Sequence, residues 1–345
     1  YLVCSPNQTR VRSATLLGQT TSGCMGVSKN GKFIVATRTR VDQPAQTNVL
    51  DREGSIKLTL ETSDQTGLPL GWQWPEPIKL LAADNKTDIY GAIFRPSDFS
   101  PEKKYPIIDW AHTNSFYSFV PKALDCFPYM SMQALAELGF IVVVIDGRGS
   151  CKRSKAFHDE AYGKVHKGSD LDDHVASITQ MAEQYPYMDL DRIGIVDMAG
   201  SNGPIYGLLA YPDFYKVGAV YSSWDLRLVS QGDVYQGLMN ESDYQGSVLG
   251  NLAGNLQGKL LIMHGMLDPF FHISGVLQLV DALVKENKDF DQVLLPNGGH
   301  AWDSSRYGLR RIWDYFVTHL KGGNPPEFKL RSGVEVAFDQ LKSEG

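Results

Sequence analysis

Serine, aspartate and histidine residues occur along the chain in an order that could support nucleophilic catalysis. Ser201 lies in the segment AGSNG, Asp268 ends the segment HGMLD, and His300 ends the segment NGGH. A serine hydroxyl becomes a good nucleophile when an imidazole takes its proton, and a carboxylate holds that imidazole in one tautomer. We therefore predict Ser201 as the nucleophile, His300 as the general base and Asp268 as the residue that orients His300.

Two registers compete for the nucleophile, and the sequence leaves both open. In the first, Ser201 is the nucleophile, because Ala199 and Gly203 supply the small residues that a tight strand-to-helix turn needs on either side. Counting from the preceding strand instead puts Ala199 at the nucleophile position, with Asp197 and Ser201 as its flanking residues. An aspartate is sterically poor at such a position and alanine carries no hydroxyl, so this register predicts an inactive site.

Strand and helix patterns alternate from residue 105 onward, and this alternation would bring the candidate residues together. The predicted strands cover residues 106–111, 140–145, 193–196, 217–221, 260–263 and 292–295, and the predicted helices cover 131–138, 170–184, 273–285 and 309–320. Continuous apolar strands separated by helices are typical of a mostly parallel sheet flanked by helices on both faces. Loops at the carboxyl ends of such strands share one edge, so the chain order Ser, Asp, His predicts an α/β-hydrolase fold.

The first hundred residues have a different character. Residues 1–65 are predicted to form short strands and turns that make one β-meander, which is too small to be stable by itself. We therefore divide the chain into this β-meander at 1–65, a linker with leading strands at 66–104, an α/β domain at 105–330 and a C-terminal tail at 331–345.

Composition excludes several classes of protein. The 345 residues include 33 lysines and arginines and 39 aspartates and glutamates, and the resulting net charge of −6 does not suit a nucleic-acid partner. No apolar run approaches the ~18 residues of a membrane-spanning helix. The four cysteines form no CxxC pair, and Asp170, Asp172 and Asp173 fit the acidic start of a helix better than a metal site. We therefore expect no metal, cofactor, nucleic acid or membrane span.

Several short segments keep a consistent order and spacing along the second part of the chain. They are KYPIID at 104–109, DGRG at 146–149, RSKAF at 153–157, DRIGI at 191–195, YPDF at 211–214, HGMLD at 264–268, GH at 299–300 and WDYF at 313–316. Through them the chain resembles the catalytic domain of the prolyl oligopeptidase family, in particular its dipeptidyl-peptidase-IV-like branch. The resemblance implies an α/β-hydrolase domain that cleaves short peptides through an acyl-enzyme, with residues 1–65 as a remnant of a β-propeller.

The resemblance also assigns residues around the site. It places His112 where the family has a tyrosine that serves the oxyanion hole, and the backbone N–H of Asn202 would be a second donor. Phe270 stands where the dipeptidyl branch has an asparagine that helps to hold the substrate. Counted without gaps from Arg192, the family elbow G-x-S-x-G-G puts its serine at Ala199. Among the aromatic residues that follow predicted strands, those considered for a substrate pocket are Trp224, Tyr235 and Phe270.

Two other functions stay open at this point. An inactive relative, with Ala199 in place of the nucleophile, would serve binding or assembly, and a generic carboxylesterase would keep the triad but act on small esters. The expected partner is thus a short peptide or a small ester, and a homo-oligomer is compatible with the sequence. The resemblance further implies a periplasmic or secreted location and a full-length protein longer than 345 residues.

Overall fold

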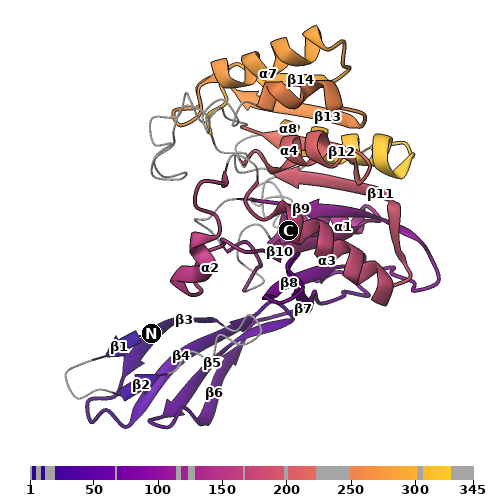
Figure 1. Cartoon of the computed structure of the whole chain (residues 1–345). Helices are drawn as coiled ribbons and strands as arrows, with labels where there is room; N and C mark the ends of the chain where they lie inside the picture. Colours follow the sequence, from indigo (N-terminus) through magenta and orange to yellow (C-terminus); the bar gives the residue numbers. More distant parts are fainter. Residues whose placement is uncertain are drawn as a thin grey trace. The chain divides into compact units, whose positions relative to one another are not determined.

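A computed structural model of the chain describes most of its residues (Figure 1). The chain falls into two compact units. The described residues are 2–4, 9–11, 20–66, 68–113, 118–122, 129–165, 168–197, 201–222, 249–300 and 306–327. The first unit comprises residues 1–110, 116–158 and 172–189, and the second comprises 111–115, 159–171 and 190–345. The predicted C-terminal tail at 331–345 lies outside the described residues.

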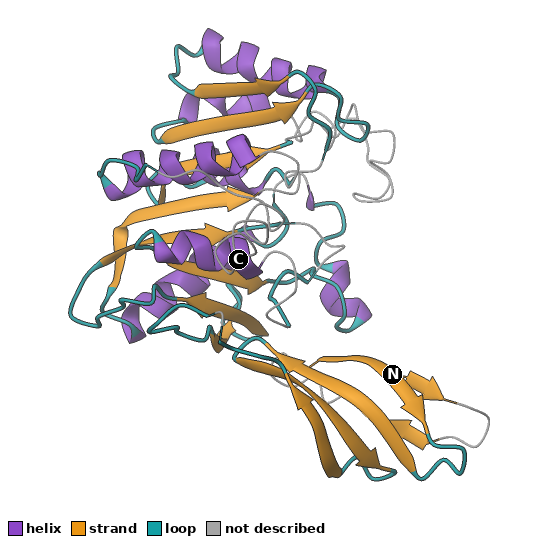
Figure 2. Cartoon of the chain, turned by 180° about the vertical axis from the view of Figure 1, so that it is seen from behind, coloured by secondary structure: helices purple, strands orange, loops and turns teal. Residues whose placement is uncertain are grey.

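The first unit begins with antiparallel strands (Figure 2). The hairpin of β1 (Leu2–Cys4) and β2 (Thr9–Val11) is followed by a four-stranded sheet of β3 (Thr20–Val27), β4 (Phe33–Arg40), β5 (Gln43–Asp51) and β6 (Ile56–Thr62). Its turns follow from the sequence, because Gly31 and Gly54 have the positive φ values, 64° and 85°, that glycine adopts without strain. The buried cluster of this sheet consists of Ile34, Ala36 and Leu50. The predicted N-terminal β-meander is confirmed.

The remainder of the first unit combines strands and helices. Its strands are β7 (Glu76–Leu81), β8 (Asp88–Phe94), β9 (Tyr105–Trp110) and β10 (Ile141–Asp146), in the order β9-β10-β8-β7. Strand β10 pairs parallel to β9 and antiparallel to β8, and β8 pairs antiparallel to β7. The helices are α1 (Tyr129–Glu137), α2 (Lys155–Asp159) and α3 (Leu171–Gln184). Strand β10 is almost completely buried, as its unbroken apolar run predicts.

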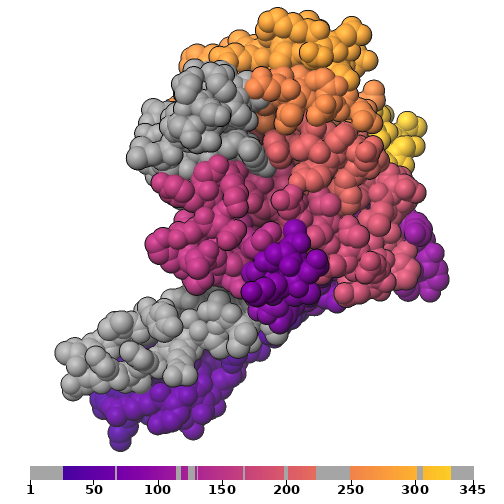
Figure 3. All heavy atoms as spheres, viewed as in Figure 1, coloured from indigo at the N-terminus to yellow at the C-terminus, as the bar shows by residue number. Residues whose placement is uncertain are grey.

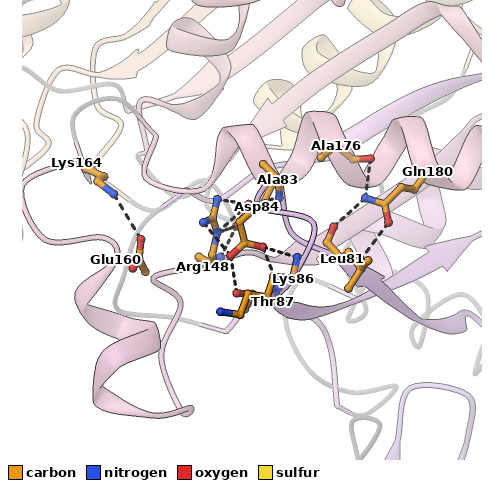
Figure 4. Close-up of polar contacts among 11 residues, drawn as sticks. Leu81, Ala83, Asp84, Lys86, Thr87, Arg148, Glu160, Lys164, Ala176 and Gln180 are labelled. Carbon is orange, nitrogen blue, oxygen red and sulfur yellow. Dashed lines mark hydrogen bonds and ion pairs between the residues drawn. The ribbon is translucent and has the colours of Figure 1, made fainter.

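Polar side chains fasten α3 to the strands of this unit (Figure 4). The Arg148 guanidinium donates to Asp173 in the first turn of α3 and also lies 3.4 Å from Asp84. The Thr87 hydroxyl and amide and the Lys86 amide lower the pKa of Asp84 to about 2. Asp172 and Asp173 thus belong to the acidic start of a helix, as predicted.

Among the described residues, no group of His, Cys, Asp or Glu side chains is arranged to hold a metal ion.

The second unit carries four parallel strands, β11 (Met188–Asp197), β12 (Tyr215–Tyr221), β13 (Lys259–Gly265) and β14 (Asp291–Leu295), paired in this order. Its helical segments are α4 (Gly203–Ala210), the 3₁₀ segment η3 (Leu249–Asn255), α7 (Ile273–Lys285), α8 (Arg306–Phe316) and the π-helical segment η5 (Val317–Lys321). Residues 249–300 form the orange surface in the space-filling view (Figure 3). The four strands end on one edge, so the loops that follow them are neighbours.

Helices cover both faces of these parallel strands. A Cβ atom added to Gly194 in β11 would lie 2.7 Å from a ring carbon of Phe316 in α8, so that face of the strand lies directly under α8. The next residue, Ile195, lies under α4 instead. A Cβ atom added to Gly207 in α4 would lie 3.0 Å from Cδ1 of Ile195. Since neighbouring residues in a strand point to opposite faces, α4 and α8 lie on opposite faces. The predicted α/β-hydrolase architecture is confirmed.

A helix that crosses a bilayer needs ~20 predominantly apolar residues. None of the described helices is long and apolar enough to cross a membrane.

Candidate active site

The loops after β13 and β14 are joined by their backbones. The amide of Met266 donates to the carbonyl of Leu295 at 2.9 Å, and the amide of Leu267 donates to the carbonyl of Gly298 at 2.9 Å. The two loops approach so closely that a Cβ atom on Gly265 would lie only 2.2 Å from the Gly299 carbonyl oxygen. Glycine is therefore required at position 265, and the two loops hold their candidate side chains at a fixed separation.

Asp268 and His300 form a direct hydrogen bond between these loops. His300 Nδ1 lies 2.8 Å from Asp268 Oδ2, while the other carboxylate oxygen accepts the amides of Phe270 and Phe271 at 2.8 and 2.9 Å. Burial by itself would raise the pKa of Asp268, but the hydrogen bonds from His300 and from the two amides outweigh burial and lower the pKa to about 2. The carboxylate is therefore ionised at neutral pH.

An ionised carboxylate fixes the tautomer of the neighbouring imidazole. Because Asp268 can only accept, Nδ1 of His300 must carry the proton, and Nε2 is left as the basic nitrogen of the neutral ring. The Asp268 side chain is 1% exposed, whereas 28% of the His300 side chain is exposed. This arrangement has the geometry of a general base with its orienting carboxylate.

Two phenylalanine rings flank the His300 imidazole. The ring centroids of Phe270 and Phe271 lie 5.0 and 4.8 Å from that of His300, both in edge-to-face geometry. Phe270 is 61% exposed and presents an apolar surface beside the imidazole. The buried His264 donates from Nε2 to the Phe271 carbonyl at 3.0 Å, and burial lowers the pKa of His264. His264 therefore fastens the turn that carries both the carboxylate and the flanking rings.

Ser201 lies in a different polar group of the same unit, and it is almost fully buried. Its backbone amide donates to Asp197 Oδ2 at 2.5 Å. Its hydroxyl donates to the Ala111 carbonyl at 3.3 Å and accepts the Gly203 amide, also at 3.3 Å. Both hydroxyl contacts are longer than the usual distance for such bonds, so the backbone of Ser201 is held more firmly than its hydroxyl.

Asp197 is the centre of this second group. It ends β11, is fully buried, and accepts from His112 Nδ1 at 3.0 Å as well as from Ser201. Burial by itself would raise the pKa of Asp197, but the His112 and Ser201 contacts outweigh burial and lower the pKa below its ordinary value. The Asp197 carboxylate thus ties the 111–113 segment to the residue two positions before α4.

The structure brings together some of the predicted site residues and separates others. Asp268, His300 and Phe270 form one group, and Ser201 and His112 belong to the group around Asp197. Asn202 is buried at the N-cap of α4 and makes no side-chain capping bond. The alternative nucleophile position Ala199 and the pocket candidates Trp224 and Tyr235 lie outside the described residues.

Sequence reasoning missed Asp197, His264 and Phe271 as parts of the site. Asp197 carried a usable signal, because a charged residue directly after a buried strand falls at the edge where ligands bind. His264 and Phe271 flank the predicted Asp268, but their roles depend on a bond between a side chain and a backbone carbonyl that no sequence pattern reveals.

Comparison with known proteins identifies the family of the chain. The model of the prolyl oligopeptidase family matches residues 127–323, which is more than half of the chain. Dipeptidyl peptidase 8 of Mus musculus is 31% identical over 244 residues, covering 68% of this chain and 27% of the mouse protein. The uncharacterized peptidase YuxL of Bacillus subtilis is 24% identical over 308 residues, covering 83% of this chain and 44% of that protein.

A solved structure shows the same fold. A Bacteroides ovatus protein assigned as a dipeptidyl aminopeptidase IV superposes with a TM-score of 0.74 at 24% identity, covering 88% of this chain and 43% of that chain. The chain therefore spans less than half the length of these relatives.

The lowered pKa of Asp268 predicts a loss of stability at acid pH. The folded-state pKa of about 2 lies below the ordinary value of 3.8, so the ionised carboxylate stabilises the fold above about pH 4 and loses this effect as the pH falls toward 2. We expect the difference in free energy of unfolding between the parent and Asp268→Asn to shrink as the pH falls from 5 to 2, measured by urea denaturation. A difference that stays constant from pH 5 to pH 2 would contradict the lowered pKa of Asp268.

The buried contact between Asp197 and His112 predicts a strong energetic coupling. Asp197→Ala leaves His112 and the Ser201 amide without their acceptor, and we expect it to lower the free energy of unfolding by ~3–5 kcal/mol. His112→Phe should cost less in the Asp197→Ala background than in the parent, measured by urea denaturation of all four proteins. Asp281→Ala, which removes an exposed partner of Lys285 in the same unit, is the control and should change little. Additive effects of the two substitutions would show that the pair is not coupled.

Proposed function

Since the chain belongs to the prolyl oligopeptidase family, we propose that its second unit is the catalytic part of a serine-type peptidase that hydrolyses short peptides through an acyl-enzyme. The observation that carries this proposal is the 2.8 Å hydrogen bond between His300 Nδ1 and Asp268 Oδ2, which leaves Nε2 of a half-exposed imidazole as a base. Relatives that are named dipeptidyl peptidases support peptides as the substrate class.

The proposed reaction has two halves. Ser201 Oγ attacks the carbonyl carbon of the peptide bond while His300 Nε2 takes the hydroxyl proton, and Asp268 stabilises the imidazolium that forms. His300 then gives the proton to the departing amine as the C–N bond breaks, which leaves an ester on Ser201. His300 then takes a proton from a water molecule as this water attacks the ester, and returns the proton to Ser201 Oγ as the ester C–O bond breaks and the acid leaves.

Ser201 must turn its hydroxyl toward His300 for this reaction. The 3.3 Å contacts of the hydroxyl with Ala111 and Gly203 are long, so a rotation of the hydroxyl away from them breaks only weak bonds. The amide of Ser201 stays on the Asp197 carboxylate during such a rotation, because the bond to the backbone does not involve the side chain.

Further predicted residues complete the proposed site. The backbone N–H of Asn202 is a proposed donor to the oxyanion, a role worth ~3–4 kcal/mol per donor. His112 gives its Nδ1–H to Asp197, so its Nε2 is a second proposed donor only when the ring is an imidazolium. The exposed ring of Phe270 is the proposed contact for an apolar substrate group, together with Trp224 and Tyr235.

A small ester can enter the same acyl-enzyme pathway. A homo-oligomer and a periplasmic or secreted location remain predictions.

Labelling with a fluorophosphonate tests the proposal, because this probe reacts covalently with an activated serine. We expect the parent to be labelled at Ser201, located by mass spectrometry of the peptides, and His300→Ala to reduce the labelling by at least about 10²-fold. Ser274→Ala is the matched control, since Ser274 also contacts a histidine, His272 Nδ1 at 2.8 Å, but at the start of α7. Its labelling should equal that of the parent.

A folded parent that is labelled at no serine would contradict the proposal. In that case, labelling that arises only in Ala199→Ser would support the inactive relative with Ala199 at the nucleophile position, serving binding or assembly.

A further inference from the structure

Tyr221 is the last residue of β12 and lies between the two polar groups of the second unit in chain order. Its ring is buried, and its hydroxyl donates to the carbonyl oxygen of Gly299 at 3.1 Å. Gly299 directly precedes His300. A side chain at the end of β12, which is separated from β14 by β13, therefore contacts the peptide group that carries the imidazole, 78 residues away along the chain.

The segment before His300 needs such a contact, because it consists of two glycines. Glycine loses more backbone freedom on ordering than any other residue, so a Gly-Gly segment holds a position only if its peptide groups are tied. The Gly298 carbonyl accepts the Leu267 amide at 2.9 Å, and the Gly299 carbonyl accepts the Tyr221 hydroxyl. Both carbonyl oxygens also lie close to Gly265, where an added Cβ atom would be 2.2 Å from that of Gly299 and 2.5 Å from that of Gly298.

The other contacts of His300 act on its ring. Asp268 holds Nδ1, and the rings of Phe270 and Phe271 both pack edge-to-face with the imidazole. These contacts orient the ring, whereas the Tyr221 hydroxyl acts on the backbone from which the ring extends. Because proton transfer depends on the position of Nε2 as well as on its orientation, both kinds of contact are required for an efficient base.

We propose that Tyr221 is a positioning residue for His300, which acts through a hydrogen bond from its hydroxyl to the Gly299 carbonyl. The inference rests on the proposed function, in which His300 is the general base. Tyr221 does not touch the reacting atoms in this account. It restricts the Gly298–Gly299 segment, so that Nε2 of His300 spends more time where it meets the nucleophile.

Tyr221→Phe tests the proposal with a minimal change, because it removes one hydroxyl and keeps the buried ring. We expect kcat for peptide hydrolysis to fall about tenfold while KM stays within about twofold, since the hydroxyl acts on the base and not on substrate binding. The imidazole resonances of His300, observed by NMR after labelling of histidine with ¹⁵N, should shift and broaden at Nδ1–H.

The chain offers a matched control for the chemical change. Tyr129 is also fully buried, and its hydroxyl donates to the Val41 carbonyl at 3.4 Å in the first unit. Tyr129→Phe removes the same atom from the same kind of bond, so we expect it to leave kcat and the His300 resonances unchanged. As a rescue, 3-fluorotyrosine introduced at position 221 keeps a donating hydroxyl and should retain the kcat of the parent.

The outcomes separate this inference from the proposed function. Parent-like kcat and parent-like His300 resonances in a folded Tyr221→Phe variant would overturn the positioning role. Equal losses in Tyr221→Phe and Tyr129→Phe would also overturn it, because they would show a general effect of removing a buried hydroxyl. If the parent hydrolyses no peptide, the proposed function fails, but the NMR comparison still decides whether Tyr221 holds His300.

Discussion

The hydrogen bond between His300 Nδ1 and Asp268 Oδ2 is the interaction on which the candidate site depends. It requires a carboxylate that stays ionised although it is buried, and the Phe270 and Phe271 amides make this possible by occupying the other oxygen. It also requires that the two loops stay at a fixed separation. Two backbone hydrogen bonds between the loops and their close approach at Gly265 hold them there. The parallel pairing of β13 with β14 in turn places both loops on one edge of the strands.

A second buried carboxylate organises the end of β11. Asp197 accepts from the His112 ring and from the Ser201 amide, so it joins the 111–113 segment to the start of α4. The two carboxylates have different tasks, since Asp268 orients a half-exposed base and Asp197 fixes a buried backbone. Catalysis in this account needs the two groups to cooperate, because the serine belongs to one and the imidazole to the other.

The sequence predicted the elements of the second unit well, and the reason is their burial. Apolar runs such as 260–263 stand out because parallel strands are covered on both faces, and the structure places this run within β13. Strand β11 begins five residues before its predicted start at Ile193, because the charged residues Asp189, Asp191 and Arg192 interrupt the apolar pattern of its first half. The Asp268–His300 contact was also predictable, because both residues follow neighbouring strands.

Contacts between distant polar residues were not predictable in the same way. His112 and Asp197 are 85 residues apart, and Tyr221 and Gly299 are 78 residues apart, so neither pair leaves a local pattern. The burial of Ser201 depends on both the 111–113 segment and Asp197, and sequence spacing alone suggested only that the serine follows a strand. Such pairs become visible only when the order of the strands is known.

The distance between Ser201 Oγ and His300 Nε2 tests the central claim most directly. It is measured in a crystal structure of the protein after treatment with a peptidyl phosphonate, which mimics the tetrahedral intermediate. We expect a covalent bond from Ser201 to phosphorus, with Nε2 of His300 within about 2.6–3.2 Å of the serine oxygen. An unmodified Ser201 whose hydroxyl still lies on the Ala111 carbonyl, with no phosphonate on any serine, would contradict it.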